Sequence, residues 1–183
     1  MTHALLLPTA EDTRSNATFD ALMWALARPG VIQPLPDACL LLLAESLLDR
    51  ECTFFSSDDG LGRQIAATGA YPAMLDEAEY VFTSLADGRN VAALSTLLAG
   101  NLLYPDASAT IFSPAMIDGA GGTRLRLSGP GVNGSIDLVI GDVDRSFWSL
   151  RAEAIRYPLG WDVYLLDCDR LVGIPRSTFI EVL

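Results

Sequence analysis

The segment between residues 52 and 100 constrains the fold most strongly, because strand-like and helix-like patterns alternate along it. Aromatic and branched runs predict strands at 52–56 and 79–83. Apolar residues at helical spacing predict helices at 61–68 and 91–99, each followed by a glycine. Alternation of this kind is typical of parallel βαβ units with right-handed crossovers, so we expect an α/β fold.

Two helices are expected ahead of this segment. The first ends near Arg28, where a proline and a glycine follow, and Thr13, Ser15 or Asn16 could cap its start. In the last turn, Arg28 would complement the helix dipole, with ligand binding as the alternative role. The second helix is expected over residues 38–50, and its leucines lie nearly all round it, which predicts deep burial.

Beyond residue 100 the pattern becomes typical of antiparallel strands. The expected strands cover residues 109–113, 124–127 and 135–140, and a Gly-Pro-Gly turn separates the last two. The glycine-rich stretch at 119–122 is interpreted as a turn, because a phosphate cradle would have to open a helix. A further helix, capped by Asp144 or Ser146, is expected to run to about Arg156.

The chain closes on a predicted β-hairpin. Residues 161–166 form an aromatic and branched run, and residues 171–174 form a second apolar run after a polar turn. Pro175 ends the second strand, because proline has no amide donor. Together these patterns predict a single three-layer domain over residues 1–183, in which helices cover the faces of one mixed sheet.

The composition limits the classes of partner. Hydrophobic residues make up 50% of the chain and charged residues only 19%, which favours a sheet buried on both faces or a surface covered by partner proteins. The formal net charge of −11 argues against nonspecific binding to nucleic acid or to an anionic membrane. No apolar run reaches the roughly 18 residues that span a membrane, and no signal peptide is evident. The protein is therefore expected in the cytoplasm, with reduced thiols.

The missing residue types exclude several kinds of catalysis. The chain has 12 arginines and no lysine, so it can supply neither a Schiff base to pyridoxal phosphate nor a phosphate-loop lysine. The only histidine is His3, close to the N-terminus, so the chain can form neither a buried Ser-His-Asp triad nor a histidine-rich metal site. Cys39, Cys52 and Cys168 are interpreted as structural thiols in apolar surroundings, and no zinc motif is present. Neither a cofactor nor a metal is expected.

Arg176 is the strongest candidate for a functional residue. It follows a proline at the end of a strand, and a guanidinium binds carboxylate or phosphate in a forked geometry. Arg151 and Arg156 precede the hairpin and could converge with it, whereas an ion pair with Asp162 is the structural alternative for Arg176. No catalytic residue is assigned. The candidate ligand- or partner-binding residues are Arg176, Arg151, Asp162, Arg28 and Thr178.

A set of sequence blocks carries a family resemblance. The blocks are Phe19, Leu22 and Met23; Ala27-Arg28-Pro29-Gly30; Leu127-Ser128-Gly129-Pro130-Gly131-Val132; Phe147-Trp148 with Arg151; and Pro158-Leu159-Gly160-x-Asp162 followed by Ile174-Pro175-Arg176-Ser177-Thr178. In this order they resemble the PhnH family, whose members are subunits of the bacterial carbon-phosphorus lyase system for phosphonate breakdown. Residues 100–106 depart from the family pattern, in which a threonine follows the glycine.

The resemblance implies a function, partners and a fold. The chain would be a supporting, not itself catalytic, subunit of the carbon-phosphorus lyase core complex. It would help to form ribose 1-alkylphosphonate 5-triphosphate from ATP and an alkylphosphonate, with release of adenine, while a different subunit carries the nucleosidase chemistry. The implied partners are the other core subunits, a second copy in a homodimer, and ATP or phosphonate at a shared site. The fold would resemble the large domain of pyridoxal-phosphate-dependent transferases, without the cofactor.

Two other functions remain open from the residues alone. A self-sufficient enzyme could use arginines with carboxylates such as Asp162 and Glu153, although no spacing marks an acid–base pair. A homo-oligomeric nucleotide-binding or regulatory module would bind ATP as the pure protein and lose that affinity on Arg176→Ala.

Overall fold

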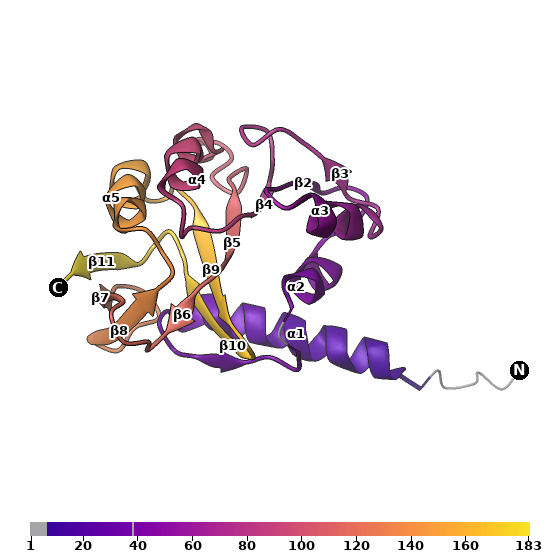
Figure 1. The fold of residues 1–183 in the computed structure, drawn as a ribbon, viewed down its shortest axis with the longest axis horizontal. Helices are drawn as coiled ribbons and strands as arrows, with labels where there is room; N and C mark the ends of the chain where they lie inside the picture. The colour runs from indigo at the N-terminus through magenta and orange to yellow at the C-terminus, as the bar shows by residue number, and fades with distance from the viewer. Residues whose placement is uncertain (1–6, 38) are drawn as a thin grey trace, which may run out of the picture.

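The computed structural model describes residues 7–37 and 39–183, and within them the chain forms five α-helices and two β-sheets (Figure 1). The helices are α1 (Ala10–Ala27), α2 (Leu40–Leu47), α3 (Asp59–Ala66), α4 (Gly88–Ala93), which a short 3-10 helix, Leu94–Thr96, continues, and α5 (Arg145–Ala154). The main sheet has the spatial order β1 (Gln33–Pro34), β10 (Arg170–Ile174), β9 (Asp162–Asp167), β5 (Thr110–Pro114), β4 (Tyr80–Phe82), β2 (Thr53–Ser56) and β3 (Tyr71–Pro72). The second sheet has the order β11 (Phe179–Val182), β7 (Thr123–Ser128), β8 (Ser135–Gly141) and β6 (Met116–Ile117).

The centre of the main sheet is parallel, as the alternation of strands and helices predicts. β2 pairs with β4, β4 with β5, and β5 with β9, all in parallel orientation. The closing hairpin is also confirmed, because β9 and β10 are antiparallel with Leu171 opposite Leu166. Two-residue strands complete the edges, β1 beside β10 and β3 beside β2.

Two predictions about the later strands are wrong. The strand expected at 109–113 is β5, which lies parallel in the main sheet and not among antiparallel pairs. Its residues Ile111 and Phe112 are both fully buried, as is usual for a strand covered on both faces. The predicted antiparallel pair does form, as β7 and β8, but it belongs to a separate sheet together with the unpredicted β11. The expectation of one mixed sheet is therefore replaced by a mixed main sheet and a smaller antiparallel one.

Side chains of the central strands point alternately into two cores, one on each face of the main sheet. Ile111 and Val163 join a cluster that includes Phe147 of α5 and residues of α4 and the second sheet. Phe112 and Tyr164 join another cluster, with side chains from α1, α2 and α3. Figure 1 shows α5 and the second sheet on one side of β9, and α1 with α2 on the other. The main sheet is thus the middle of three layers, and the second sheet forms part of one outer layer.

An aromatic stack crosses three parallel strands on the α1 side of the main sheet. The ring of Phe112 lies 4.7 Å from that of Phe82 and 5.1 Å from that of Tyr164, measured between centroids. The Tyr164 hydroxyl donates a hydrogen bond of 3.1 Å to the carbonyl of Leu22 in α1, and burial raises its pKa. This contact fixes α1 against the middle of the sheet.

The backbone of α1 also approaches β10 closely, and a glycine makes this possible. A Cβ at Gly173 would lie 2.6 Å from both the carbonyl carbon and the carbonyl oxygen of Ala25. Ala25 is itself fully buried, and Leu22 is 1% exposed. The contact therefore requires a residue without a side chain on β10.

A capping box sets the start of α1. The Thr9 hydroxyl accepts from the amide of Asp12, and the Asp12 carboxylate accepts from the amide of Thr9 at 2.8 Å. The caps proposed at Thr13, Ser15 and Asn16 are therefore wrong, because the reciprocal pair begins the helix several residues earlier.

The other helix boundaries agree with the sequence to different degrees. Asp144 caps α5 as predicted, since its carboxylate accepts from the Ser146 amide at 2.9 Å, although the helix ends at Ala154. α2 is shorter than the expected 38–50, and residue 38 lies outside the described residues. Its burial is partial, and the buried positions are Leu42, Leu43 and Ala44.

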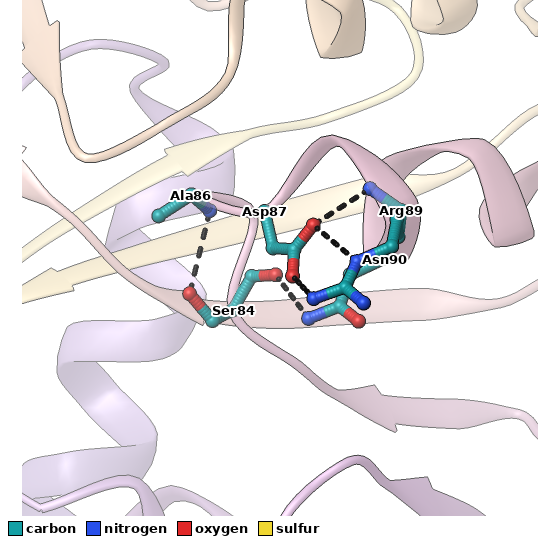
Figure 2. Close-up of polar contacts among 5 residues, drawn as sticks. All are labelled: Ser84, Ala86, Asp87, Arg89 and Asn90. Atoms are coloured by element: carbon teal, nitrogen blue, oxygen red, sulfur yellow. Dashed lines mark hydrogen bonds and ion pairs between the residues drawn. The ribbon is translucent and has the colours of Figure 1, made fainter.

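Polar contacts start α4 three residues before the predicted helix. The Asp87 carboxylate accepts from the amide of Arg89 at 2.8 Å and from its guanidinium at 2.9 Å (Figure 2). The Asn90 amide group donates to the carbonyl of Ser84 at 3.0 Å, and the Ser84 hydroxyl accepts from the amide of Ala86. The hydrogen bonds from Arg89 lower the pKa of Asp87. This turn is a helix cap whose polar groups are paired with one another.

The three cysteines are free thiols. Cys39 and Cys52 are half-buried, in partial agreement with a structural role. Cys168 is exposed in the turn between β9 and β10, where its φ is 52°, so its interpretation as a thiol in apolar surroundings is wrong. A two-residue turn between antiparallel strands often needs this left-handed conformation.

Candidate functional site

Arg176 forms a forked ion pair with Asp162. The carboxylate at the start of β9 accepts from Nε and Nη2 of Arg176, at 3.2 and 2.6 Å, and also from its backbone amide at 2.8 Å. The two side chains are only 17% and 16% exposed. The structural alternative for Arg176 is therefore observed, and Asp162 already occupies one edge of the guanidinium.

The remaining Nη1 of Arg176 donates to the carbonyl of Pro105, in the loop that departs from the family pattern. The tip of this loop is apolar and exposed, with Leu103 84% exposed. Asn101 shapes the tip, since its side-chain oxygen accepts from the amides of Leu103 and Tyr104, both at 2.9 Å. Arg176 thus ties the loop at 100–106 to the segment that leaves the closing hairpin.

Arg151 is a buried cation that projects from α5 toward the same segment. Its side chain donates to the carbonyls of Pro175 and Thr178, at 2.8 and 3.3 Å. The residue is 3% exposed, and none of the ion pairs found in residues 7–37 and 39–183 involves it. Burial lowers the pKa of Arg151 to about 10, an effect that the charge of Asp162 partly offsets. At neutral pH the guanidinium is therefore charged and held by backbone carbonyls.

A cavity of about 410 Å³ lies beside Arg151. Three of the side chains that line it have a buried polar atom with no hydrogen-bond partner among the described residues: Nε of Arg151, Oγ1 of Thr178 and Nε1 of Trp148. All three residues are at least 96% buried. The full lining comprises Pro130, Trp148, Arg151, Ala152, Ile155, Tyr157, Arg176, Ser177, Thr178, Phe179 and Ile180. The wall therefore combines two cations and unpaired donors with a largely apolar remainder.

The structure brings most of the candidate residues together. Arg151, Arg176 and Thr178 line the cavity, and Asp162 contacts Arg176. Arg28 lies elsewhere, stacked 4.5 Å from the centre of the Trp24 ring just past the end of α1. It does not join the cluster, because the end of α1 packs against the turn between β7 and β8 instead.

The structure places Arg156 outside the cavity wall and Trp148 within it. Arg156 does not line the cavity, and its backbone pairs with Leu159 in a tight turn. Trp148 does line it, although the sequence marks it only as one member of a family block. The sequence does contain an indication of this placement: Trp148 precedes Arg151 by three residues, so both side chains lie on one face of α5.

A second hollow of about 940 Å³ opens at the carboxyl ends of β2 and β4. Its lining includes Asp58, whose carboxylate caps α3, and Arg63. None of its lining residues has a buried polar atom left unpaired within the part of the chain that the structure describes. In the same part of the chain, no three His, Cys, Asp or Glu side chains gather closely enough to hold a metal ion. The cavity beside Arg151 is therefore the better-defined candidate site.

Comparison with known proteins assigns the family. Residues 9–181 match the family described as "Bacterial phosphonate metabolism protein (PhnH)". The chain belongs to the PhnH family. It is also 32% identical, over 179 residues, to the "Putative C-P lyase subunit protein HtxG" of Stutzerimonas stutzeri. That similarity covers 92% of this chain and 87% of the relative.

The cavity is lined in part by the sequence blocks that resemble the PhnH family. Three of the blocks that resemble the family contribute to its lining, through Pro130, Trp148 with Arg151, and the run from Arg176 to Thr178. Blocks that lie far apart in the chain thus meet at one place.

None of the helices within residues 7–37 and 39–183 has the length and apolar character needed to cross a membrane.

Proposed function

We propose that this PhnH-family chain is a subunit of a carbon-phosphorus lyase core complex in alkylphosphonate degradation. The observation that carries the proposal is the family match over residues 9–181. The similarity to a relative whose name describes a C-P lyase subunit, across 92% of this chain, supports the same function. The other core subunits are its partners.

Within that complex, the chain supports the formation of ribose 1-alkylphosphonate 5-triphosphate from ATP and an alkylphosphonate, with release of adenine. It is a supporting subunit of this transferase complex, and the nucleosidase chemistry lies in another subunit. Two observations favour a binding role: the chain has no lysine and one histidine, and its candidate cavity presents arginines and hydrogen-bond donors. ATP or the phosphonate would meet such groups at a site shared with a partner subunit.

The surface and the fold are part of the proposal. Large apolar side chains lie exposed on the loop at 100–106, and such a patch suits contact with another subunit or with a second copy in a homodimer. We place the protein in the cytoplasm as a single domain. Its three-layer arrangement is compatible with the large domain of pyridoxal-phosphate-dependent transferases, without the cofactor. The exposed tip residues are Leu102, Leu103 and Tyr104.

The test measures first whether the complex assembles and then how much activity it loses when this chain is left out. The tagged chain is co-expressed with the other core subunits from its own genome, and native mass spectrometry of the purified material should give a stable mixed complex. The same complex made without this chain should release adenine and form the triphosphate product at a strongly reduced rate. The proposal fails if the chain stays apart from the other subunits at micromolar concentration. It also fails if the product forms equally well without it.

A lone chain that binds ATP or releases adenine by itself would instead support the nucleotide-binding module or the self-sufficient enzyme. Isothermal titration of the isolated chain with ATP tests the first of these functions, and an assay for adenine release by the same chain tests the second. The three readouts use separate preparations: the co-expressed complex, the complex made without this chain, and the isolated chain. Because assembly and activity are measured separately, a failure of one is distinguishable from a failure of the other.

A further inference from the structure

The cavity beside α5 is lined by side chains that carry buried donors without acceptors. Nε of Arg151 and Nε1 of Trp148 can only donate a hydrogen bond, and the Thr178 hydroxyl can donate or accept. None of the three atoms has a partner within the described residues, and each belongs to a side chain that lines the cavity. Buried polar atoms are usually paired, because an unpaired one loses its hydration without compensation. An occupant of the cavity would therefore be recognised through acceptor atoms.

The charge of the wall favours an anionic occupant over water. Arg151 is 3% exposed, and its partners in the described part of the chain are two neutral carbonyls. Arg176 also lines the cavity, but Asp162 already balances its charge. A buried cation without a carboxylate in direct contact is costly, even though the charge of Asp162 partly offsets the burial, and an oxyanion would supply both a direct counter-ion and the missing acceptors.

The size and the apolar part of the wall favour an organic molecule over a bare ion. The cavity measures about 410 Å³, whereas a water molecule occupies about 30 Å³ in the liquid. Small-molecule sites typically begin at roughly 300 Å³. Ile155, Phe179 and Ile180 form apolar wall around the polar groups. A ligand with an anionic head and a short apolar body would satisfy both parts.

We propose that this cavity binds a small organic oxyanion, whose oxygens accept hydrogen bonds from Arg151, Thr178 and Trp148 and whose apolar body lies against Ile155, Phe179 and Ile180. A phosphonate, a phosphate monoester and a carboxylate share this chemistry. The inference rests on the cavity and holds whether or not the chain assembles with other subunits.

The test uses the purified full-length chain and measures both binding and stability. Ethylphosphonate, propanoate and inorganic phosphate are the anionic probes, and 1-propanol is the neutral probe. Each is titrated calorimetrically and assayed for its effect on the melting temperature. At least one organic anion should bind and raise the melting temperature, whereas 1-propanol should not. The preferred organic anion distinguishes a phosphonate head group from a carboxylate.

Thr178→Val separates a binding role from a structural role. The substitution removes a hydroxyl that has no partner in the described structure and keeps the shape of the side chain, so the melting temperature of the free protein should not fall. Affinity for the organic anion should fall about tenfold or more, because hydrogen bonds to charged groups are among the stronger ones. Trp148→Phe, which removes the indole donor, should weaken binding in the same way.

Ser108→Ala is the matched control. Ser108 is 6% exposed and also has an unpaired hydroxyl among the described residues, but it does not line the cavity. Binding should be unchanged in this variant. The inference is overturned if none of the anions binds at millimolar concentration, or if Thr178→Val and Ser108→Ala bind alike. It is also overturned if only inorganic phosphate binds, since the apolar wall would then have no role.

Discussion

At the scale of single residues, two arginines in one wall have different environments. Arg176 has a carboxylate partner, and its neighbour Arg151 has only carbonyls. The guanidinium of Arg151 contacts the same segment after the closing hairpin in which Arg176 lies. The two arginines therefore differ in their partners and not in their location. Arg176 is held as part of the fold, and Arg151 has no carboxylate in direct contact, although the charge of Asp162 acts on it across space.

The ion pair of Arg176 and Asp162 should contribute measurably to stability. Arg176→Ala leaves a mostly buried carboxylate without its partner, and we expect the free energy of unfolding to fall by about 1–3 kcal/mol, less than for a fully buried pair because both side chains retain some exposure. Urea unfolding at pH 7 of Arg176→Ala, Asp162→Ala and the double variant gives the coupling energy. Strictly additive effects would contradict a pairwise interaction.

The pair of Arg89 and Asp87 is the matched control for that measurement. It has a similar distance of 2.9 Å, but its side chains are 92% and 42% exposed. Solvent screens such a pair, so Arg89→Ala should change stability little. A large effect at this exposed pair would mean that exposure does not explain the difference.

At the scale of elements, the contact between α1 and β10 has no spare space. Gly173 places the strand against the carbonyl group of Ala25, while the Tyr164 hydroxyl on the neighbouring strand bonds to the same helix. Backbone atoms on both sides leave little freedom to adjust. The position of the first helix on the sheet therefore depends on one glycine.

Gly173→Ala should destabilise the fold. The added methyl group would lie 2.6 Å from backbone atoms of Ala25, so α1 or β10 must move, and overpacking of this kind typically costs about 1–3 kcal/mol. Thermal unfolding followed by circular dichroism measures the loss. Gly62→Ala in α3 is the control, because its Cβ would meet Ser56 at an ordinary 3.5 Å and alanine favours a helix. Equal melting temperatures for the two variants would contradict the close approach.

Local signals predicted the elements better than their pairing partners. The closing hairpin and the cap of α5 were readable, because a turn or a cap lies within a few residues of what it organises. The parallel partners of β5 and the separation of the second sheet were not, since β5 pairs with segments 30 and 52 residues away in the chain. Two-residue edge strands leave too short a pattern to be recognised.

For the candidate site, too, the sequence predicted which segments matter but not how their atoms are paired in the packed structure. The blocks around Arg151 and Arg176 pointed to the closing segment, and the structure brings them to one cavity. The unpaired atoms of Trp148 and Thr178 could not be predicted, because whether a buried atom has a partner depends on the packed structure. Arg28 satisfied the same chemical criterion as the other arginines and lies elsewhere.

At the scale of the whole molecule, a polar clamp joins the two sheets. The carboxylate of Asp167 in β9 accepts from the amide of Ile117 in β6 at 2.9 Å and from the guanidinium of Arg170 in β10. Arg170 in turn donates to the carbonyl of Ile117 at 2.7 Å. The hydrogen bond from the Ile117 amide is the main cause that lowers the pKa of Asp167, and Arg170 lowers it further.

The clamp predicts part of the acid response of the protein. Because the pKa of Asp167 is lower in the folded state, its contribution is fully present above the ordinary value of 3.8 and is lost as the pH falls through the folded value. Asp167→Asn should lower the free energy of unfolding by about 1.5–3 kcal/mol at pH 7, as expected for a hydrogen bond to a charged group. The difference from the parent chain should shrink below pH 4.

Melting temperatures between pH 7 and pH 2 provide the measurement. Asp20→Asn, on an exposed position of α1, makes the same change in net charge without touching either sheet. This control should follow the parent chain at every pH. A constant gap between Asp167→Asn and the parent chain down to pH 2 would show that ionisation of Asp167 does not stabilise the contact.

Arg176 is shared between a cavity wall and a surface loop, because one of its nitrogens holds the carbonyl of Pro105. A ligand that drew this guanidinium inward would loosen the anchor of the loop and change how its apolar tip is presented. Thermodynamic linkage then works in both directions, so whatever docks on the tip would alter the affinity of the cavity by the same factor. Through this one side chain, filling of the cavity and docking at the loop tip would then be thermodynamically linked.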